Sequence, residues 1–103
     1  MNDLIYNYLI LKCVGYDNRV KGQVLMKKFG IKDHKTFRKH IELIRQSPDC
    51  PRMIGSKAGQ NGGYWIIANK KEFDDTVFHL YARAKEMKKT AKLLQKKAKK
   101  EGI

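Results

Sequence analysis

The sequence has few cysteines, no long uninterrupted apolar run and few acidic residues, and each shortage removes a class of protein. Its two cysteines, Cys13 and Cys50, lie far apart and have no Cys or His neighbours at metal-ligand spacing, which excludes a disulfide framework and a zinc finger. We expect two reduced thiols, with Cys13 in the core. The longest apolar stretch, residues 4–14, is interrupted by Asn7 and Lys12, so neither a membrane-spanning segment nor a signal peptide is predicted. A cytoplasmic protein is therefore the default expectation.

The scarcity of acidic residues gives the chain a strong positive charge. There are 10 Asp and Glu residues against 23 Lys and Arg residues, and the formal net charge at pH 7 is +13. A polyanion is therefore the first partner to consider, either a nucleic acid or an anionic membrane surface. The 103 residues, of which 42% are hydrophobic, suffice for one small domain with a tail and exclude wholesale disorder.

Apolar spacing predicts three helices in the first half of the chain. The first covers residues 3–14, with Asn2 or Asp3 as its cap, the second covers residues 22–29, and the third, basic and amphipathic, covers residues 34–46. The apolar positions of the first helix are Leu4, Ile5, Tyr8, Leu9, Leu11 and Val14. We expect one shared core that contains Leu4, Leu9, Leu25, Phe29, Phe37, Ile41, Ile44, Ile54 and Trp65.

A tight turn is predicted between the second and third helices. Gly30 can close the second helix in the left-handed conformation, and Ile31 follows as an apolar plug. Asp33 then stands in an N-cap position before the third helix. The segment before the second helix, residues 15–19, collects turn-forming residues.

A hairpin and one long helix are predicted after Pro48. Residues 53–54 and 64–68 have strand character, and the glycine-rich stretch 55–63 between them is expected to be a flexible loop. Asn69 and Glu72 have the spacing of a capping box, so a last helix should start near residue 70 and continue to about residue 100.

These elements and their residues resemble a known family. Leu25-Met26-Lys27-Lys28-Phe29-Gly30-Ile31 and Thr36-Phe37-Arg38-Lys39-His40-Ile41 resemble the helix-turn-helix of winged-helix DNA-binding proteins. Gly63-Tyr64-Trp65-Ile66, then Glu72, Leu80 and Arg83-Ala84, are similar to small winged-helix proteins of phages and prophages in Gram-positive bacteria. Lys32 departs from the pattern as an extra residue in the turn.

The resemblance covers nearly the whole chain and implies both a fold and a role. The implied fold is α+β: a winged helix-turn-helix of three helices plus a β-hairpin wing over residues 1–69, followed by a long basic helix over residues 70–103. The implied role is a phage or mobile-element transcription regulator that works in the bacterial cytoplasm or in a phage-infected host cell. No effector domain fits within the chain, so regulation is expected to come from occupying a DNA site.

The third helix carries side chains long enough to reach base edges in the major groove. The base-reading candidates are His34, Lys35, Arg38, Lys39 and Glu42. Arg38 can pair bidentately with guanine, whereas Glu42 either accepts from cytosine or, as we favour, pairs with Arg38 or Lys39. A solvated charged helix face is the structural alternative.

Backbone or minor-groove contacts are expected from the wing at residues 55–63 and from basic residues near it. These candidates are Lys27, Lys28, Arg45, Lys57, Gln60 and Asn61. An ordinary flexible loop is the alternative reading of the wing. Trp65 is expected in the core, with base stacking as the less favoured alternative.

The last helix carries most of the net charge and an apolar seam. Nine basic residues stand against Glu86 alone between Arg83 and Lys100. Its apolar positions keep heptad spacing, which favours a homodimer through the seam Val77, Leu80, Ala84, Met87, Ala91, Leu94 and Ala98. The alternatives are packing against the first helix and, less favoured, binding to a membrane surface.

No catalytic constellation is evident. His34, His40 and His79 have no Cys or Ser partner in a recognisable motif, and the pair Asp74-Asp75 is explained by the start of the last helix. We therefore predict a non-enzymatic protein that binds double-stranded DNA as a homodimer, without a cofactor, a small-molecule substrate or a membrane partner. The alternatives are a replication or DNA-processing accessory factor and a module that binds an acidic host protein with the same face.

Overall fold

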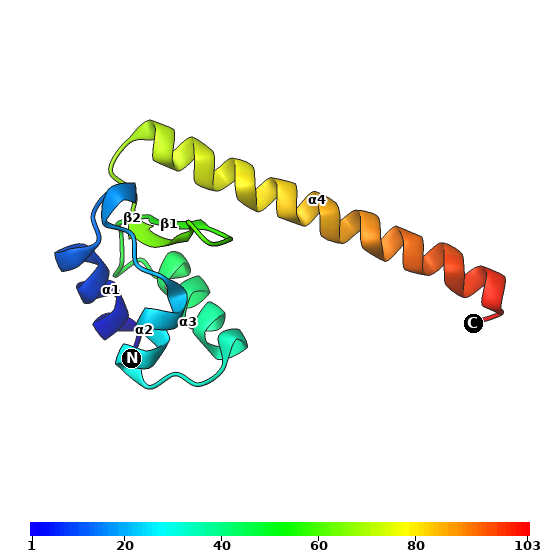
Figure 1. Cartoon of the computed structure of the whole chain (residues 1–103), viewed down its shortest axis with the longest axis horizontal. Helices are drawn as coiled ribbons and strands as arrows, with labels where there is room; N and C mark the ends of the chain where they lie inside the picture. Colours follow the sequence, from blue (N-terminus) through cyan, green and yellow to red (C-terminus); the bar gives the residue numbers. More distant parts are fainter.

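Four α-helices and a two-stranded antiparallel sheet make an α+β fold. The computed structural model describes all 103 residues. The elements are α1 (Asn2–Lys12), a 3₁₀ helix η1 (Tyr16–Asn18), α2 (Gly22–Phe29), α3 (His34–Gln46), β1 (Ile54–Lys57), β2 (Gly63–Ile66) and α4 (Lys70–Glu101). Figure 1 shows the first three helices and the hairpin gathered into one body, from which α4 runs out to the C-terminus.

The turn between α2 and α3 is built as the sequence predicts. Gly30 takes the left-handed conformation with φ of 68°, and the Ile31 N–H donates to the Met26 carbonyl at 2.9 Å. The Asp33 carboxylate accepts from the Thr36 hydroxyl at 2.9 Å and from the Lys35 N–H at 3.1 Å. These two hydrogen bonds hold the pKa of Asp33 below its ordinary value. The cap and the glycine thus set where α3 begins.

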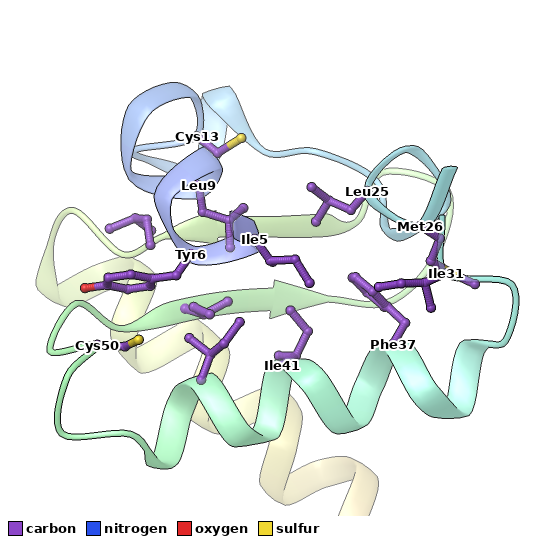
Figure 2. Packing of buried hydrophobic residues seen from close by; sticks show 13 residues of the cluster. Ile5, Tyr6, Leu9, Cys13, Leu25, Met26, Ile31, Phe37, Ile41 and Cys50 are labelled. Carbon is purple, nitrogen blue, oxygen red and sulfur yellow. The ribbon is translucent and has the colours of Figure 1, made fainter. Parts of the chain in front are cut away.

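The core lies between α1, α2, α3 and the hairpin, as Figure 2 shows. Phe37, Ile41 and Ile44 of α3 face inward. Trp65 on β2 is only 2% exposed, so it is no stacking platform for bases. The prediction of one shared core is nevertheless wrong for Trp65, which lies outside the main buried cluster, and for Phe29, which is only partly buried against it. The 13 buried residues of the main cluster are Ile5, Tyr6, Leu9, Cys13, Leu25, Met26, Ile31, Phe37, Ile41, Ile44, Cys50, Ile54 and Ile66. Burial raises the pKa of the Cys13 thiol. Both cysteines are free, and Cys13 is buried as expected; Cys50 is buried as well.

Helix α1 corrects two predictions. Leu4 is 58% exposed and lies outside the core, and Leu11, at 78%, faces away as well, because α1 is apolar on more than one side and presents Ile5 and Leu9 inward. Met1, not Asn2 or Asp3, is the N-cap, and no side chain caps this helix. The Asn2 side chain instead forms a hydrogen bond with Nδ1 of His40 on α3.

The hairpin is more regular than the predicted flexible loop. β1 pairs antiparallel with β2 from Ile54 opposite Ile66 to Lys57 opposite Gly63, which leaves only residues 58–62 in the loop. Val20, which follows the predicted turn at residues 15–19, also joins this sheet, because Val20 and Tyr64 exchange two backbone hydrogen bonds of 2.9 and 2.8 Å. A methyl group on Gly63 would lie 2.6 Å from the Val20 carbonyl oxygen, so glycine is needed for this close approach.

Helix α4 begins at the predicted cap and extends far beyond the rest of the molecule. The Asn69 side chain accepts from the Glu72 N–H at 3.0 Å, while the Glu72 carboxylate accepts from the N–H groups of Ala68 and Tyr16, each at 3.0 Å. From Leu80 to the C-terminus every residue is exposed except Ala98, which is half-buried. The molecule therefore measures 54 × 32 × 29 Å. None of the helices has the length and apolar character needed to cross a membrane.

Candidate nucleic-acid interface

A basic groove runs between the start of α2, the exposed face of α3 and the hairpin. It has a volume of about 430 Å³. The basic residues that line it are Lys21, His34, Arg38, Lys57 and Arg83, and we call this set the basic groove. No Asp or Glu residue lines it. A concave surface with cationic walls and no carboxylate concentrates positive potential and favours an anionic ligand.

The start of α2 adds backbone donors to this groove. Lys21 is the N-cap of α2 but provides no side-chain cap, and Gly22 and Gln23 of the first turn line the groove. The first N–H groups of a helix lack partners within it and carry a partial positive charge, which stabilises a bound anion. A methyl group on Gly22 would lie 3.2 Å from the Tyr64 ring, so the missing side chain keeps α2 close to the hairpin.

Tyr64 lies among the arginine side chains of this surface. Its ring packs edge-on against the ring of Phe37 with centroids 5.3 Å apart, which links the hairpin to α3. Burial raises the pKa of the Tyr64 phenol, and the positive charges of Arg45, Arg38 and Arg83 oppose this shift without cancelling it. The phenol therefore stays neutral beside three guanidinium groups.

The tip of the hairpin is tied to η1. The Asn61 carbonyl accepts from Arg19 Nε at 2.8 Å and from the Tyr16 hydroxyl at 3.2 Å. The Arg19 guanidinium also lies 4.2 Å from the centre of the Tyr16 ring. These contacts hold the loop in one position, so Lys57 and Gln60 are presented to the groove by an anchored hairpin.

The structure brings together only some of the residues proposed from the sequence. Four of them line the basic groove: His34, Arg38, Lys57 and Gln60. Five others are exposed but lie outside it: Lys27, Lys35, Lys39, Glu42 and Asn61. Lys28 lies on the side of α2 that faces α1, where its Nζ atom sits 4.9 Å from the centre of the Tyr8 ring.

Arg45 and Glu42 have a different relationship from the one predicted. Glu42 pairs with Arg45 at 3.1 Å and not with Arg38 or Lys39. Arg45 also donates to the Ile54 carbonyl at 2.9 Å and to the Ser56 hydroxyl at 3.0 Å. We therefore assign Arg45 to fixing β1 against α3, since most of its donors are already used. Arg38 in turn keeps its guanidinium free of protein partners.

Two groove residues were missed by the sequence reasoning. Lys21 stands outside every predicted helix, and Arg83 was counted only as part of the charge of the last helix. The signal for Lys21 was its place directly before the first turn of α2. Arg83 joins the groove because α4 passes over the hairpin on its way out, which the local sequence does not reveal.

A second groove, of mixed charge, lies between η1 and the start of α4. It has a volume of about 540 Å³ and is lined by Asp17, Glu72 and Asp75 together with Lys57 and Lys71. The three carboxylates offset the two lysines, so this groove favours a polyanion less than the basic groove does. Trp65 Nε1 and Thr76 Oγ1, both buried beside it, have no hydrogen-bond partner. Its carboxylates therefore separate it from the basic groove as a nucleic-acid surface.

No cluster of three or more His, Cys, Asp and Glu side chains is arranged to hold a metal ion. Comparison of the chain with protein-family models, curated proteins and solved structures gives no match.

Proposed function

We propose that this protein binds double-stranded DNA through the basic groove and that its fold is a winged helix with the β1–β2 hairpin as the wing. The observation that carries the proposal is the gathering of five basic side chains from α2, α3, the hairpin and α4 in a groove without a carboxylate. The resemblance to winged-helix DNA-binding proteins supports a role in regulating transcription, exercised by occupying a DNA site.

In this proposal α3 enters the major groove of the duplex. Arg38 is the principal base reader, because its guanidinium is exposed and free and can form two parallel hydrogen bonds with guanine. Lys57 and Gln60 on the anchored hairpin contact the backbone or the minor groove. Lys21 and the first N–H groups of α2 bind a phosphate between these two contacts.

An acidic protein partner is the competing interpretation of the same face. That interpretation is favoured where positive charge is confined to the C-terminal part of α4, whereas DNA binding needs it across α3 and the hairpin. The basic groove extends over both elements, which supports DNA as the partner.

A second copy of the chain completes the proposal. The seam of α4 leaves Leu80, Met87 and Leu94 exposed along a helix that its own domain does not cover. Burying this stripe against an identical helix removes apolar surface from water. Linking two groove-bearing domains also increases the affinity for a duplex with two half-sites.

The test is a titration of a fluorescent duplex with the full chain and three variants. Arg38→Ala should weaken binding to a sequence selected from a random pool by about 1 to 3 kcal/mol and relax its base preference, while Lys57→Ala should weaken all sequences alike. Lys12→Ala is the charge-matched control, because Lys12 is exposed at the end of α1 and does not line the basic groove.

Salt and a competitor distinguish the two partners. The logarithm of the affinity should fall with the logarithm of salt concentration with a slope on the order of −4, if about five phosphates are contacted. Equal losses in all three variants, or displacement of the duplex by polyglutamate at an equal concentration of charge, would contradict the proposal.

A further inference from the structure

The apolar seam of α4 has the same spacing when read in either direction. With Phe73 included, its members are separated by 4, 3, 4, 3, 4, 3 and 4 positions along the helix. They are Phe73, Val77, Leu80, Ala84, Met87, Ala91, Leu94 and Ala98. The seams of two identical α4 helices therefore match layer by layer when the helices lie antiparallel, with the two-fold axis between Lys85 and Glu86.

An apolar groove lies beside the first half of this seam. Two adjoining hollows of about 220 and 350 Å³ share Met53, Ile67 and Phe73, and the smaller one continues along Val77 and Leu80. These five residues are here called the apolar groove. Arg45 and Arg52 also line the smaller hollow, and Lys70 lines the larger one. Met53, Phe73 and Leu80 are exposed in the apolar groove. An apolar surface of the domain is therefore left uncovered at the point where α4 leaves it.

We infer that two copies of the chain pair antiparallel through α4, so that the second half of each α4 lies in the apolar groove of the other copy. This inference rests on the proposed homodimer and adds the relative orientation of the two α4 helices, their register and the groove that each one occupies. Three independent features of the molecule support it: the sizes of the facing side chains, the distribution of charge along α4 and the position of the groove.

Side-chain size favours the reversed register. The facing pairs between the two copies are Phe73 with Ala98, Val77 with Leu94, Leu80 with Ala91, and Ala84 with Met87. Most layers then combine a bulky side chain with alanine, which fills space evenly along the interface. Parallel pairing sets each residue against itself, so from Leu80 onward layers of two large side chains alternate with layers of two alanines. The large layers would hold the helices apart where the alanines need a close approach.

The charge distribution along α4 selects the same orientation. Lys70 and Lys71 accompany Glu72, Asp74 and Asp75 at its start, and Lys70 pairs with Asp74, whereas its last turns carry Lys96, Lys97, Lys99 and Lys100. Reversal places the nearly neutral start of one helix beside the basic end of the other, which keeps the two basic ends apart. Parallel pairing brings two strongly basic halves together and sets Arg83 near Lys88 of the second copy. Exposed ion pairs contribute little each, so these charges determine orientation more than affinity.

The position of the apolar groove matches the reversed register. Phe73, Val77 and Leu80 line both the groove and the seam, and they face Ala98, Leu94 and Ala91 of the second copy. Leu94 therefore enters the hollow beside Val77, flanked by two alanines that let the helix approach. In the parallel arrangement the second half of α4 does not reach this groove, and its leucines meet only each other.

Distances between spin labels test the orientation directly. Lys89→Cys and Lys96→Cys place a label one heptad apart on the outer side of α4, away from the seam. Antiparallel pairing predicts axial separations of about 10 Å between the two labels at position 89 and about 32 Å at position 96, from a rise of about 1.5 Å per residue. The wild-type chain is the labelling control, because Cys13 and Cys50 are buried. Equal distances at the two positions indicate parallel pairing and overturn the inference.

Two neighbouring leucines provide a matched test of the seam. Leu93 and Leu94 are both exposed, at 53% and 62%, but only Leu94 belongs to the seam. Leu94→Asp should raise the dimer dissociation constant about 100-fold or more, because two buried leucines are replaced by two charges, while Leu93→Asp leaves it nearly unchanged.

Met53→Ser tests the apolar groove itself, and it should weaken the dimer although residue 53 lies outside α4. Equal effects of the two leucine variants, an unchanged dimer in Met53→Ser, or a monomeric wild type at tens of micromolar each overturn the inference. The Leu94→Asp monomer still carries an intact basic groove, so its binding to a single-site duplex tests the proposed function separately.

Discussion

Replacing Glu72, which is half-buried, should destabilise the protein more than removing any of the exposed charges of α4. Its carboxylate accepts from the backbone N–H groups of Tyr16 and Ala68, at 3.0 Å each, and from the Asn69 side chain at 3.3 Å. The first contact crosses from α4 to η1, so this one side chain fastens the long helix to the body of the domain. Loss of a helix cap typically costs about 1 kcal/mol, and a hydrogen bond to a charged group contributes about 1.5 to 3 kcal/mol when fully buried.

The magnitude follows from the partial exposure of this carboxylate. Water replaces part of the lost interaction, so we expect Glu72→Ala to lower the free energy of unfolding by about 2 kcal/mol and Glu72→Gln by about 1 kcal/mol. For a domain of this size a loss of about 2 kcal/mol lowers Tm by about 10 °C. Thermal unfolding followed by circular dichroism at one protein concentration measures it. Glu86→Ala is the control, since Glu86 is exposed and makes no hydrogen bond, and it should stay within about 0.5 kcal/mol of wild type.

The same prediction has a pH dependence of defined sign. Partial burial tends to raise the pKa of Glu72, but the accepted hydrogen bonds outweigh it and hold the pKa below its ordinary value of 4.5. The stabilisation is therefore fully present above about pH 4.5 and is lost as the pH falls through the lower pKa of the folded state. The gap in stability between wild type and Glu72→Gln should shrink below pH 4.5. A gap that stays constant down to pH 3, or a Glu72→Ala variant as stable as Glu86→Ala, would refute the reasoning.

Three further outcomes are expected. Arg45→Ala should lower the free energy of unfolding, measured by urea denaturation, by about 1 to 2 kcal/mol, because it removes hydrogen bonds from α3 to β1. Arg38→Ala should leave the free energy of unfolding within about 0.5 kcal/mol of wild type, and the reverse ranking contradicts our assignment of the two arginines. Gly63→Ala should cost about 1 to 3 kcal/mol, since its methyl group meets the Val20 carbonyl oxygen, and wild-type stability would argue against that contact. The Cys13 thiol should react with an aromatic disulfide reagent only after unfolding, because burial raises its pKa and blocks access, and rapid reaction in the native protein would contradict its position in the core.

The helix ends that depend on a single nearby residue could be predicted from the sequence. Gly30, Asp33 and Asn69 each act through the backbone of their own neighbourhood, and the helix ends they mark were predicted correctly. The inward face of α1 could not be predicted in the same way, because Leu4 and Leu11 offer apolar surface on sides that tertiary packing leaves uncovered. Only the positions of α3 and the hairpin decide which side is buried.

The candidate site was predicted in part for a similar reason. Arg38 and Lys57 were found because each lies on an element whose role the pattern indicated. Arg83 was missed as a groove residue because its place depends on the path of α4 over the hairpin, and the pairing of Glu42 with Arg45 depends on where β1 lies. Several partners satisfy helical spacing for Glu42, and only the three-dimensional structure selects between them.

The most direct test of the central claim maps where DNA touches the protein. Backbone amide chemical shifts of the ¹⁵N-labelled chain are followed while a duplex selected from a random pool is added at moderate salt. We expect the largest changes to cluster in the basic groove, at residues 21–23, 34–38 and 57–64, and Arg38→Ala to reduce them throughout this set. Changes confined to residues 85–101, with none in α3 or the hairpin, would show that only the basic tail attracts DNA and that the basic groove is not the DNA-binding surface.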